Sequence, residues 1–268
     1  MAEKILHKEL SYLLNGCIFD VHNEVGPGLR EECYQKALEH RLWHAGISFV
    51  AKPATRRDLR YQDVSVHTFE PDLVVAERII PELKHQANAF AEANYTQLLS
   101  YLKCWGLRLG LLVNFALQSA VIERIPYDPR TSEPEEDYGQ ISEVIRDRHQ
   151  PILHASREGL LRINREIGLG YPDVIYRNMA TVGFRSLGLA VSGDVMVMPQ
   201  FRERSLPSSP ITPLVVDGQV CVEIQAINDD ITARAVRTMQ THLRLTSCDI
   251  GLIASFGRTR FRIVGVRA

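Results

Sequence analysis

The sequence has few of the features that would mark a secreted, membrane-spanning or disulfide-stabilised protein. Its 268 residues include five cysteines, an odd number scattered along the chain without a CxxC pair. This pattern argues against a zinc site and a disulfide framework, and it is typical of a reducing compartment. No segment approaches the run of about 18 apolar residues that a membrane helix needs. The charged N-terminus also lacks the apolar stretch of a signal peptide. We therefore expect a cytoplasmic protein that makes no membrane contact.

An excess of charge of either sign is missing as well. The chain has 31 Lys and Arg residues against 32 Asp and Glu residues, which leaves a formal net charge of −1. A chain without a global basic excess binds nucleic acid only through a local basic patch. The length is sufficient for one large domain or two modest ones.

Hydrophobic periodicity gives an order of helix, helix, three strands, helix and two strands for the first half. Apolar residues at three- and four-residue steps predict a helix over 6–25, which the glycines of Gly26-Pro27-Gly28 end. A second helix is expected over 30–45 and a third over 90–103. Strands are expected over 47–50, on both sides of a turn at 76–78, and over 107–115 and 119–127. Residues 128–140 are rich in proline and acidic residues and predict an exposed linker.

The second half repeats the first at an offset of about 141 to 142 residues. REIGLGYPDVIY, TPLVVDGQVCVEIQ and GLIASF parallel NEVGPGLREECY, PDLVVAERIIPELK and GLLVNF, in the same order. Three collinear matches at one spacing predict a tandem duplication. We expect an α/β (mixed α+β) chain with one domain over 1–127 and a second over 141–268, each with a central mixed sheet flanked by helices.

Three charged residues of the first half could carry chemistry. Glu82 and Lys84 lie two apart and therefore point to one face of a strand. A turn centred on Glu77 places Asp72 opposite Glu82, with Cβ atoms about 5 Å apart. Two carboxylates at that distance favour a cation between them, and oxygen ligands suit magnesium or manganese. A lysine beside the pair can stabilise charge that develops on a phosphate.

The alternative is a surface hairpin with solvated charges. The apolar flanks LVVAERII favour an interior hairpin, where unpaired charges are costly. Pro81 removes a hydrogen-bond donor next to the acid pair, so the strand must be bulged or lack a partner on one side.

Two motifs resemble a known family. GLREECY (28–34) matches the GxxExxY signature, and PDLVVAERIIPELK (71–84) is similar to the second motif of the same family. GxxExxY proteins are grouped with the PD-(D/E)XK nuclease-like superfamily, in the branch akin to RecB-type nucleases. The resemblance covers about residues 5–127. It implies a restriction-endonuclease-like fold in both copies.

The resemblance also implies roles for particular residues. Asp72 and Glu82 would be metal ligands for Mg²⁺ or Mn²⁺, with Lys84 as the catalytic lysine. Glu31 would be the additional acidic residue of the metal site. Gln97 and Tyr101 match the Gln-x-x-x-Tyr helix motif that lines such sites, and their spacing places them on one helix face.

Other residues allow a structural interpretation as well as a functional one. His22 resembles a histidine found near such sites, but a lone helical histidine is more often structural. Tyr34 lies on the apolar face of its helix, which favours a core position. Gly26 and Gly28 are expected to be turn glycines and not a phosphate loop.

Two basic clusters are open to both interpretations as well. Arg56, Arg57 and Arg60 could meet a phosphate backbone or form a solvated strand face. The same alternatives apply to the alternating arginines of GRTRFRIVG (257–265) in the second half, namely Arg258, Arg260 and Arg262.

The second half keeps the apolar frame and loses most of the chemistry. The residues that replace Glu31, Asp72, Glu82, Lys84, Gln97, Tyr101 and His22 are Asp173, Pro213, Glu223, Gln225, Thr238, His242 and Asn164. Asp173 and Glu223 leave one pair of potential metal ligands. We expect this copy to be a degenerate domain that serves as structure or binds substrate.

The function expected is a magnesium-dependent phosphodiesterase that acts on nucleic acid through the first domain, with DNA as the expected substrate. The alternative is a non-catalytic nucleic-acid-binding or assembly module with a vestigial site. A third reading is a structural partner of another protein. The two repeats are expected to form an intramolecular pseudo-dimer, and a protein partner or a homo-oligomer is left open.

Overall fold

The computed structural model describes residues 6–129 and 131–268. Residues 1–5 of the predicted first domain and residue 130 of the predicted linker lie outside the described part. The chain forms two compact units, one from residues up to Leu59 and His67–Asp128, the other from Arg60–Val66 and Pro129–Ala268. Residues 60–66 thus group with the second unit, which differs from the predicted first domain of 1–127. They form the turn end of a separate two-stranded hairpin that is not part of the first sheet.

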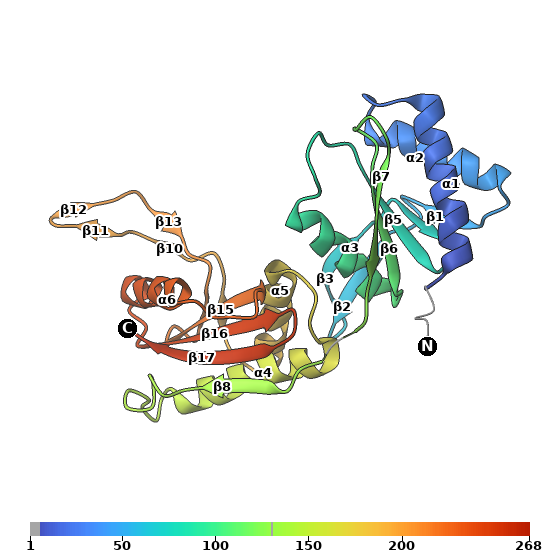
Figure 1. The fold of residues 1–268 in the computed structure, drawn as a ribbon. Coiled ribbons are helices and arrows are strands. Elements are labelled where there is room, and N and C mark those ends of the chain that lie inside the picture. The colour runs from blue at the N-terminus through green and yellow to red at the C-terminus, as the bar shows by residue number, and fades with distance from the viewer. Residues whose placement is uncertain (1–5, 130) are drawn as a thin grey trace. The chain divides into compact units, whose positions relative to one another are not determined.

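The first copy contains three helices and seven strands among the described residues (Figure 1). In chain order they are α1 (Lys8–Val25), α2 (Glu31–His44), β1 (Phe49–Ala51), β2 (Arg57–Tyr61), β3 (Val64–Phe69), β4 (Leu73–Val75), β5 (Ile79–Lys84), α3 (Glu92–Trp105), β6 (Leu109–Asn114) and β7 (Val121–Pro126). The central sheet has the order β1-β4-β5-β6-β7. Only β5 and β6 are parallel, and the other neighbours are antiparallel.

Helices cover both faces of this sheet. Alternate residues of β6, including Leu109 and Leu111, join the buried core that α1 and α2 form with the sheet. The intervening residue Gly110 faces α3, because a Cβ there would lie 2.7 Å from the Leu98 side chain. The same alternation in β5 turns Leu83 toward α1 and α2, and it turns Glu82 and Lys84 toward α3.

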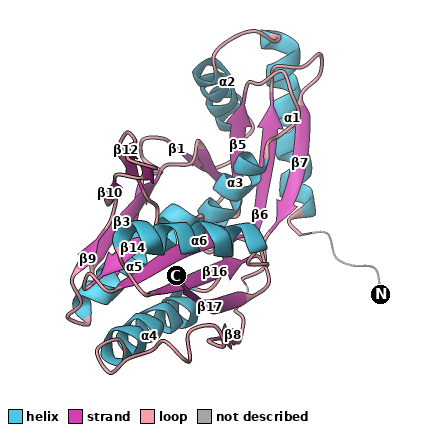
Figure 2. Ribbon diagram, turned by 90° about the vertical axis from the view of Figure 1, so that its left-hand side faces the viewer, coloured by secondary structure: helices cyan, strands magenta, loops and turns pink. Residues whose placement is uncertain are grey.

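The second copy repeats this arrangement (Figure 2). Its elements are β8 (Pro134–Asp137), α4 (Gln150–Ile167), α5 (Asp173–Ser186), β9 (Val191–Ser192), β10 (Met196–Val197), β11 (Gln200–Phe201), β12 (Arg204–Ser205), β13 (Ser209–Pro210), β14 (Leu214–Val216), β15 (Val220–Ile227), α6 (Ala233–Thr246), β16 (Ile250–Gly257) and β17 (Phe261–Arg267). The sheet order β9-β14-β15-β16-β17 has the same sequence of strand directions as the first sheet. The predicted α/β class, with a mixed sheet flanked by helices in each copy, is confirmed.

One part of the predicted linker is a strand. β8 pairs in parallel with β17 and extends the second sheet at its edge. Residues 134–137 of the predicted exposed linker over 128–140 are therefore mostly exposed, but they form an edge strand of the second sheet. An edge strand needs only main-chain hydrogen bonds on one side, so a segment with few apolar residues can form it. Arg157 of α4 also contacts both carboxylate oxygens of Glu136 at 2.6 Å.

The hairpin of β2 and β3 was also missing from the predicted order of elements.

No helix of the described residues is both long enough and apolar enough to cross a membrane.

The glycine turn between the first two helices is built alike in both copies. Gly26 and Gly28 have φ of 73° and 103°, a region that favours glycine. The Tyr34 hydroxyl donates to the Gly26 carbonyl at 2.8 Å and accepts from the Leu29 amide at 3.1 Å. In the second copy, the Tyr176 hydroxyl donates to the equivalent carbonyl of Gly168 at 2.6 Å. The tyrosine thus fixes the turn that sets the start of α2, where Glu31 lies.

Candidate functional site

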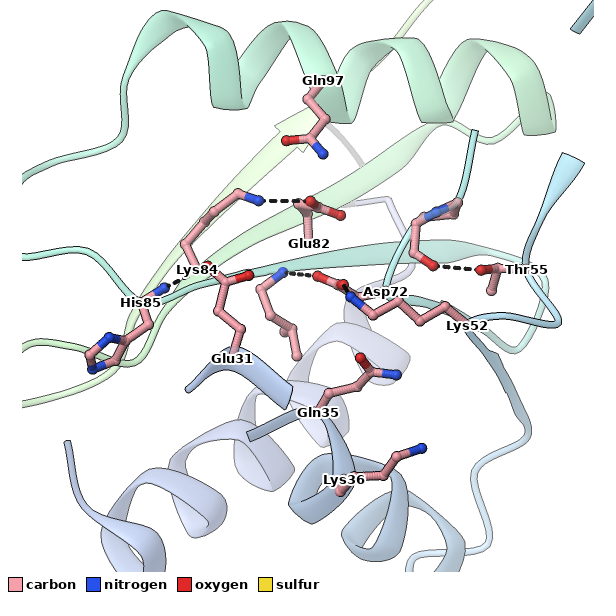
Figure 3. Close-up of polar contacts among 12 residues, drawn as sticks. Glu31, Gln35, Lys36, Lys52, Thr55, Asp72, Glu82, Lys84, His85 and Gln97 are labelled. Carbon is pink, nitrogen blue, oxygen red and sulfur yellow. Dashed lines mark hydrogen bonds and ion pairs between the residues drawn. The ribbon is translucent and has the colours of Figure 1, made fainter. Parts of the chain in front are cut away.

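Two buried carboxylates lie on the α3 side of the first sheet (Figure 3). Asp72 directly precedes β4, and Glu82 lies on β5. The register Val75↔Ile79 brings the residues before β4 alongside the end of β5, as the predicted turn required. Asp72 is 5% exposed and Glu82 is 3% exposed. The sequence therefore places two acidic groups together inside the protein, where each charge needs a partner.

Asp72 is held by one main-chain donor and one lysine. Its Oδ2 atom accepts a hydrogen bond from the Leu83 amide at 2.8 Å. Its Oδ1 atom lies 2.5 Å from the Nζ atom of Lys52. The Leu83 amide lies two residues after Pro81, at a position of β5 that β4 does not reach, because β4 begins only at Leu73. The side chain of Asp72 thus supplies the acceptor that a longer β4 would have provided.

Glu82 is only partly satisfied. Its Oε1 atom lies 2.8 Å from the Nζ atom of Lys84, which is on the same strand face. Among the described residues, its Oε2 atom is buried and has no hydrogen-bond partner. Burial, and then the negative charge of Asp72, raise the pKa of Glu82 to about 7, against the lowering effect of Lys84. A buried carboxylate oxygen without a hydrogen-bond partner reduces the stability of the folded protein, so it is unfavourable in a purely structural role.

Lys52 is a site residue that the sequence did not reveal. It follows β1, whose register Ala51↔Leu73 places Lys52 opposite Asp72. Its amide also donates to the Asp72 carbonyl at 3.1 Å. An opposite-charge cross-strand pair was the signal that could have found it. That signal was hidden because the hairpin of β2 and β3 separates the two strands in sequence.

Both lysines hold their positive charge. Burial lowers the pKa of Lys52, and its hydrogen bond to Asp72 together with the charges of the nearby carboxylates outweighs this effect, so the pKa lies above its ordinary value. Burial also lowers the pKa of Lys84, and the charge and hydrogen bond of Glu82 outweigh this effect, so its pKa lies above the ordinary value as well. The site therefore contains two ammonium groups that compensate two carboxylates.

Glu31 lies near this cluster but contacts the main chain. It is the first residue of α2, and its Oε1 atom accepts the His85 amide at 3.2 Å. Within residues 6–129 and 131–268, no group of three or more His, Cys, Asp or Glu side chains is placed to hold a metal ion. The predicted site of three carboxylates is thus not assembled in this arrangement, and Glu31 as a metal ligand stays a prediction.

The carboxylate pair nevertheless fits a hard divalent cation. Magnesium is commonly bound through one or two carboxylates and keeps several of its waters. Asp72 and Glu82 supply two such groups, and the Oε2 atom of Glu82 is a buried carboxylate oxygen that lacks a hydrogen-bond partner among the described residues. These two residues are the ones that could hold the ion.

The predicted helix pair on α3 is formed. The Nε2 atom of Gln97 donates to the Tyr101 hydroxyl at 2.8 Å. Figure 3 shows Gln97 pointing from α3 toward Glu82. Burial and the charge of Glu82 raise the pKa of Tyr101, so this hydroxyl stays protonated.

Two other candidates of the first copy have structural contacts. His22 is buried, and its Nε2 atom lies 2.9 Å from the Leu117 carbonyl. Tyr34 is fully buried and stacks on Phe115 with ring centroids 4.6 Å apart. The core position expected for Tyr34 is therefore confirmed.

The three arginines of the predicted basic cluster are exposed. Arg57 donates to the Cys104 carbonyl at 3.2 Å, and its guanidinium lies 4.6 Å from the ring centroid of Trp105. Arg60 donates to the carbonyl of Asp63 within its own hairpin. A role of Arg56, Arg57 and Arg60 in nucleic-acid binding stays a prediction.

The equivalent position of the second copy has a different environment. Glu223 occupies the place of Glu82, and its Oε2 atom accepts a hydrogen bond from Thr212 at 2.7 Å. Burial raises the pKa of Glu223, and Thr212 and the charge of Arg177 oppose that shift. Asp173 is exposed and accepts the amide of its neighbour Val174 at 2.8 Å. The acid that remains is thus satisfied by protein groups.

The arginines near the end of the second copy also have partners. Arg260 pairs with Asp230 at 2.9 Å, and Arg262 pairs with Glu135 of β8 at 3.2 Å. These ion pairs give the two side chains a structural role in the second copy.

Two stretches of the chain match the sequence model of a known family. That family is described as the PD-(D/E)XK nuclease superfamily, and the matches cover residues 8–125 and 151–266. No curated protein and no solved structure matches the chain. Because each copy matches separately, the predicted tandem duplication is confirmed.

Proposed function

Because the chain belongs to the PD-(D/E)XK nuclease superfamily, we propose that its first copy is a magnesium- or manganese-dependent nuclease that acts on DNA. The GxxExxY motif and the pair of Gln97 and Tyr101 assign it to the RecB-like branch in this proposal. The second copy serves as structure or as a platform for substrate, and the protein acts in the cytoplasm.

One observation carries the proposal. The Oε2 atom of Glu82 has no hydrogen-bond partner among the described residues, although it is buried beside a second carboxylate. A structural acid at this depth is normally fully hydrogen-bonded. Glu223, at the same place in the second copy, has Thr212 as a partner. The unsatisfied oxygen is therefore specific to the copy that also keeps Asp72 and Lys84.

Each residue has a defined task in this proposal. Asp72 and Glu82 bind the cation, and Glu31 is the further acidic residue of the site. When bound, a divalent cation supplies Lewis acidity at the scissile phosphate. Lys84 keeps its ammonium group 2.8 Å from Glu82 and stabilises the negative charge that develops on the phosphate oxygens.

The remaining residues orient and bind. Gln97 and Tyr101 hold each other on the α3 side of the site. Arg56, Arg57 and Arg60 are the local basic patch proposed to contact the DNA backbone.

The test compares the two copies at one position. DNA cleavage is measured with Mg²⁺ and with Mn²⁺ for the wild type, Lys84→Ala and Gln225→Ala, which truncate equivalent residues. We expect Lys84→Ala to lower the cleavage rate by about 100-fold or more, the scale seen when a charge-stabilising group is removed. Gln225→Ala should retain the wild-type rate. A chelator should abolish cleavage by both proteins. Cleavage that survives Lys84→Ala, or that ignores the chelator, would refute the proposal.

A second function is favoured by a specific contact. Lys52 and Lys84 already compensate Asp72 and Glu82 without an added cation. This arrangement fits a nucleic-acid-binding or assembly module with a vestigial site. DNA binding without metal-dependent cleavage, unchanged in Lys84→Ala, would identify that function.

A further inference from the structure

Lys52 lies where the negative charges of the site converge. Its Nζ atom contacts Asp72 at 2.5 Å. The negative charges of Glu82 and Glu31 also act on this ammonium group. Figure 3 shows the Lys52 side chain reaching Asp72 from the β1 side, with Glu31 and Glu82 on the other side of that carboxylate. The ammonium group therefore neutralises Asp72, one of the two carboxylates that the proposed function assigns to the metal ion.

Lys52 and Lys84 differ in how far they can move. The side chain of Lys52 is 37% exposed, whereas that of Lys84 is 14% exposed. A lysine with a flexible four-carbon stem can withdraw its ammonium into water at little cost when one end of the side chain is already solvated. A divalent cation and an ammonium group repel each other, so metal binding at the acid pair favours release of the more exposed lysine, Lys52, and leaves the more buried Lys84 in place.

The second copy has lost both members of this pair. The registers Phe49↔Val75 and Val191↔Val216 make Phe49 and Val191 equivalent. By the same count Asp194 occupies the place of Lys52, and Pro213 occupies the place of Asp72. Asp194 is exposed and pairs with Arg177 at 3.0 Å. The cation is thus absent from the copy in which the carboxylate is absent.

We propose that Lys52 is an internal counter-ion that takes the place of the metal ion on Asp72 in the metal-free protein and is displaced into solvent when a divalent cation binds. Lys52 is then a positioning residue that keeps the acid pair together and weakens metal binding by competition. The inference rests on the proposed function only in assigning the metal ion to Asp72 and Glu82.

Metal binding without nucleic acid tests the inference. Calorimetric titrations with Mn²⁺ compare the full-length wild type, Lys52→Met and Lys36→Met. The last variant is the matched control, because Lys36 pairs with Glu39 at the surface of α2. Each titration is repeated in a Glu82→Gln background to subtract binding elsewhere. We expect Lys52→Met to bind Mn²⁺ about tenfold more tightly, equivalent to about 1.4 kcal/mol, and Lys36→Met to bind like the wild type.

Stability supplies a second readout. Both tryptophans, Trp43 and Trp105, belong to the first copy, so their fluorescence follows its denaturation. Metal-free Lys52→Met should be less stable than the wild type because Asp72 has lost its cation, and saturating Mn²⁺ should close the gap. Lys52→Gln, which keeps a hydrogen-bond donor without the charge, replaces Lys52→Met if that variant does not fold.

The outcomes separate the two proposals. If Lys52→Met binds Mn²⁺ no more tightly than the wild type, and the wild type cleaves DNA, the counter-ion role is wrong and the proposed nuclease function is retained. Tight binding in Lys52→Met without cleavage by any variant supports the counter-ion role and removes the nuclease. The absence of specific Mn²⁺ binding in both proteins overturns the counter-ion role.

Discussion

Replacing Glu82 with glutamine should stabilise the metal-free first copy at pH 8. Glutamine resembles the protonated acid, and the pKa of Glu82 is raised from 4.5 to about 7. Because the pKa of Glu82 is higher in the folded than in the unfolded state, its contribution to the free energy of unfolding is greatest below pH 4.5. This contribution is lost as the pH rises through about 7. The difference of about 2.5 pKa units corresponds to about 3 kcal/mol at pH 8. Glu82 is almost fully buried, so solvent screening does not reduce this value greatly.

The assay is chemical denaturation followed by tryptophan fluorescence, in chelator-treated buffer at pH 5 and pH 8. The free energy of unfolding of Glu82→Gln should exceed that of the wild type by about 3 kcal/mol at pH 8 and by much less at pH 5. Glu223→Gln, the equivalent change in the second copy, should leave this transition unchanged. A Glu82→Gln protein that is less stable than the wild type at both pH values would refute the reasoning, because it would show that the carboxylate is fully satisfied.

Two further pairs of variants use the repeat as an internal control. Tyr34→Phe and Tyr176→Phe should each lower the free energy of unfolding of their own copy by about 1–3 kcal/mol, since each leaves a turn carbonyl without its donor. A loss below about 0.5 kcal/mol in denaturation experiments would contradict this role of the tyrosines. Gly110→Ala should cost about 1–3 kcal/mol, because the new Cβ would lie 2.7 Å from the Leu98 side chain. Gly251→Ala should lower the free energy of unfolding by less, since the neighbouring side chain is a flexible methionine. Equal losses of amide protection from hydrogen exchange in the two sheets would contradict that difference.

The core of the site could be predicted from sequence because one hairpin carries it. A turn centred on Glu77 fixed the register of Asp72 against Glu82, and strand alternation placed Lys84 on the same face. Both inferences depend on residues close in sequence, where strand geometry leaves little freedom. The structure has the register Val75↔Ile79, which follows from the same turn.

The features that were missed depend on contacts between distant segments or on main-chain pairing alone. Lys52 meets Asp72 only because β1 pairs with β4 across the hairpin of β2 and β3. Strand β8 pairs with β17 through its main chain, and its sequence, Pro-Glu-Glu-Asp, has no apolar alternation that would predict a strand. Glu31 was placed from a family resemblance, and its observed contact with the His85 amide has no signature in local sequence.

The repeat separates what the fold requires from what the site requires. The tyrosine that caps the glycine turn keeps the same hydrogen bond in both copies, so its role is to position α2. Glu82 also persists, as Glu223, but only the second copy gives its acid a neutral partner in Thr212. A buried acid that was retained for stability alone would be expected to gain such a partner in both copies. The first copy instead keeps an unsatisfied oxygen beside Asp72 and surrounds the pair with two lysines. That combination is costly for folding, and binding a cation is what would offset the cost.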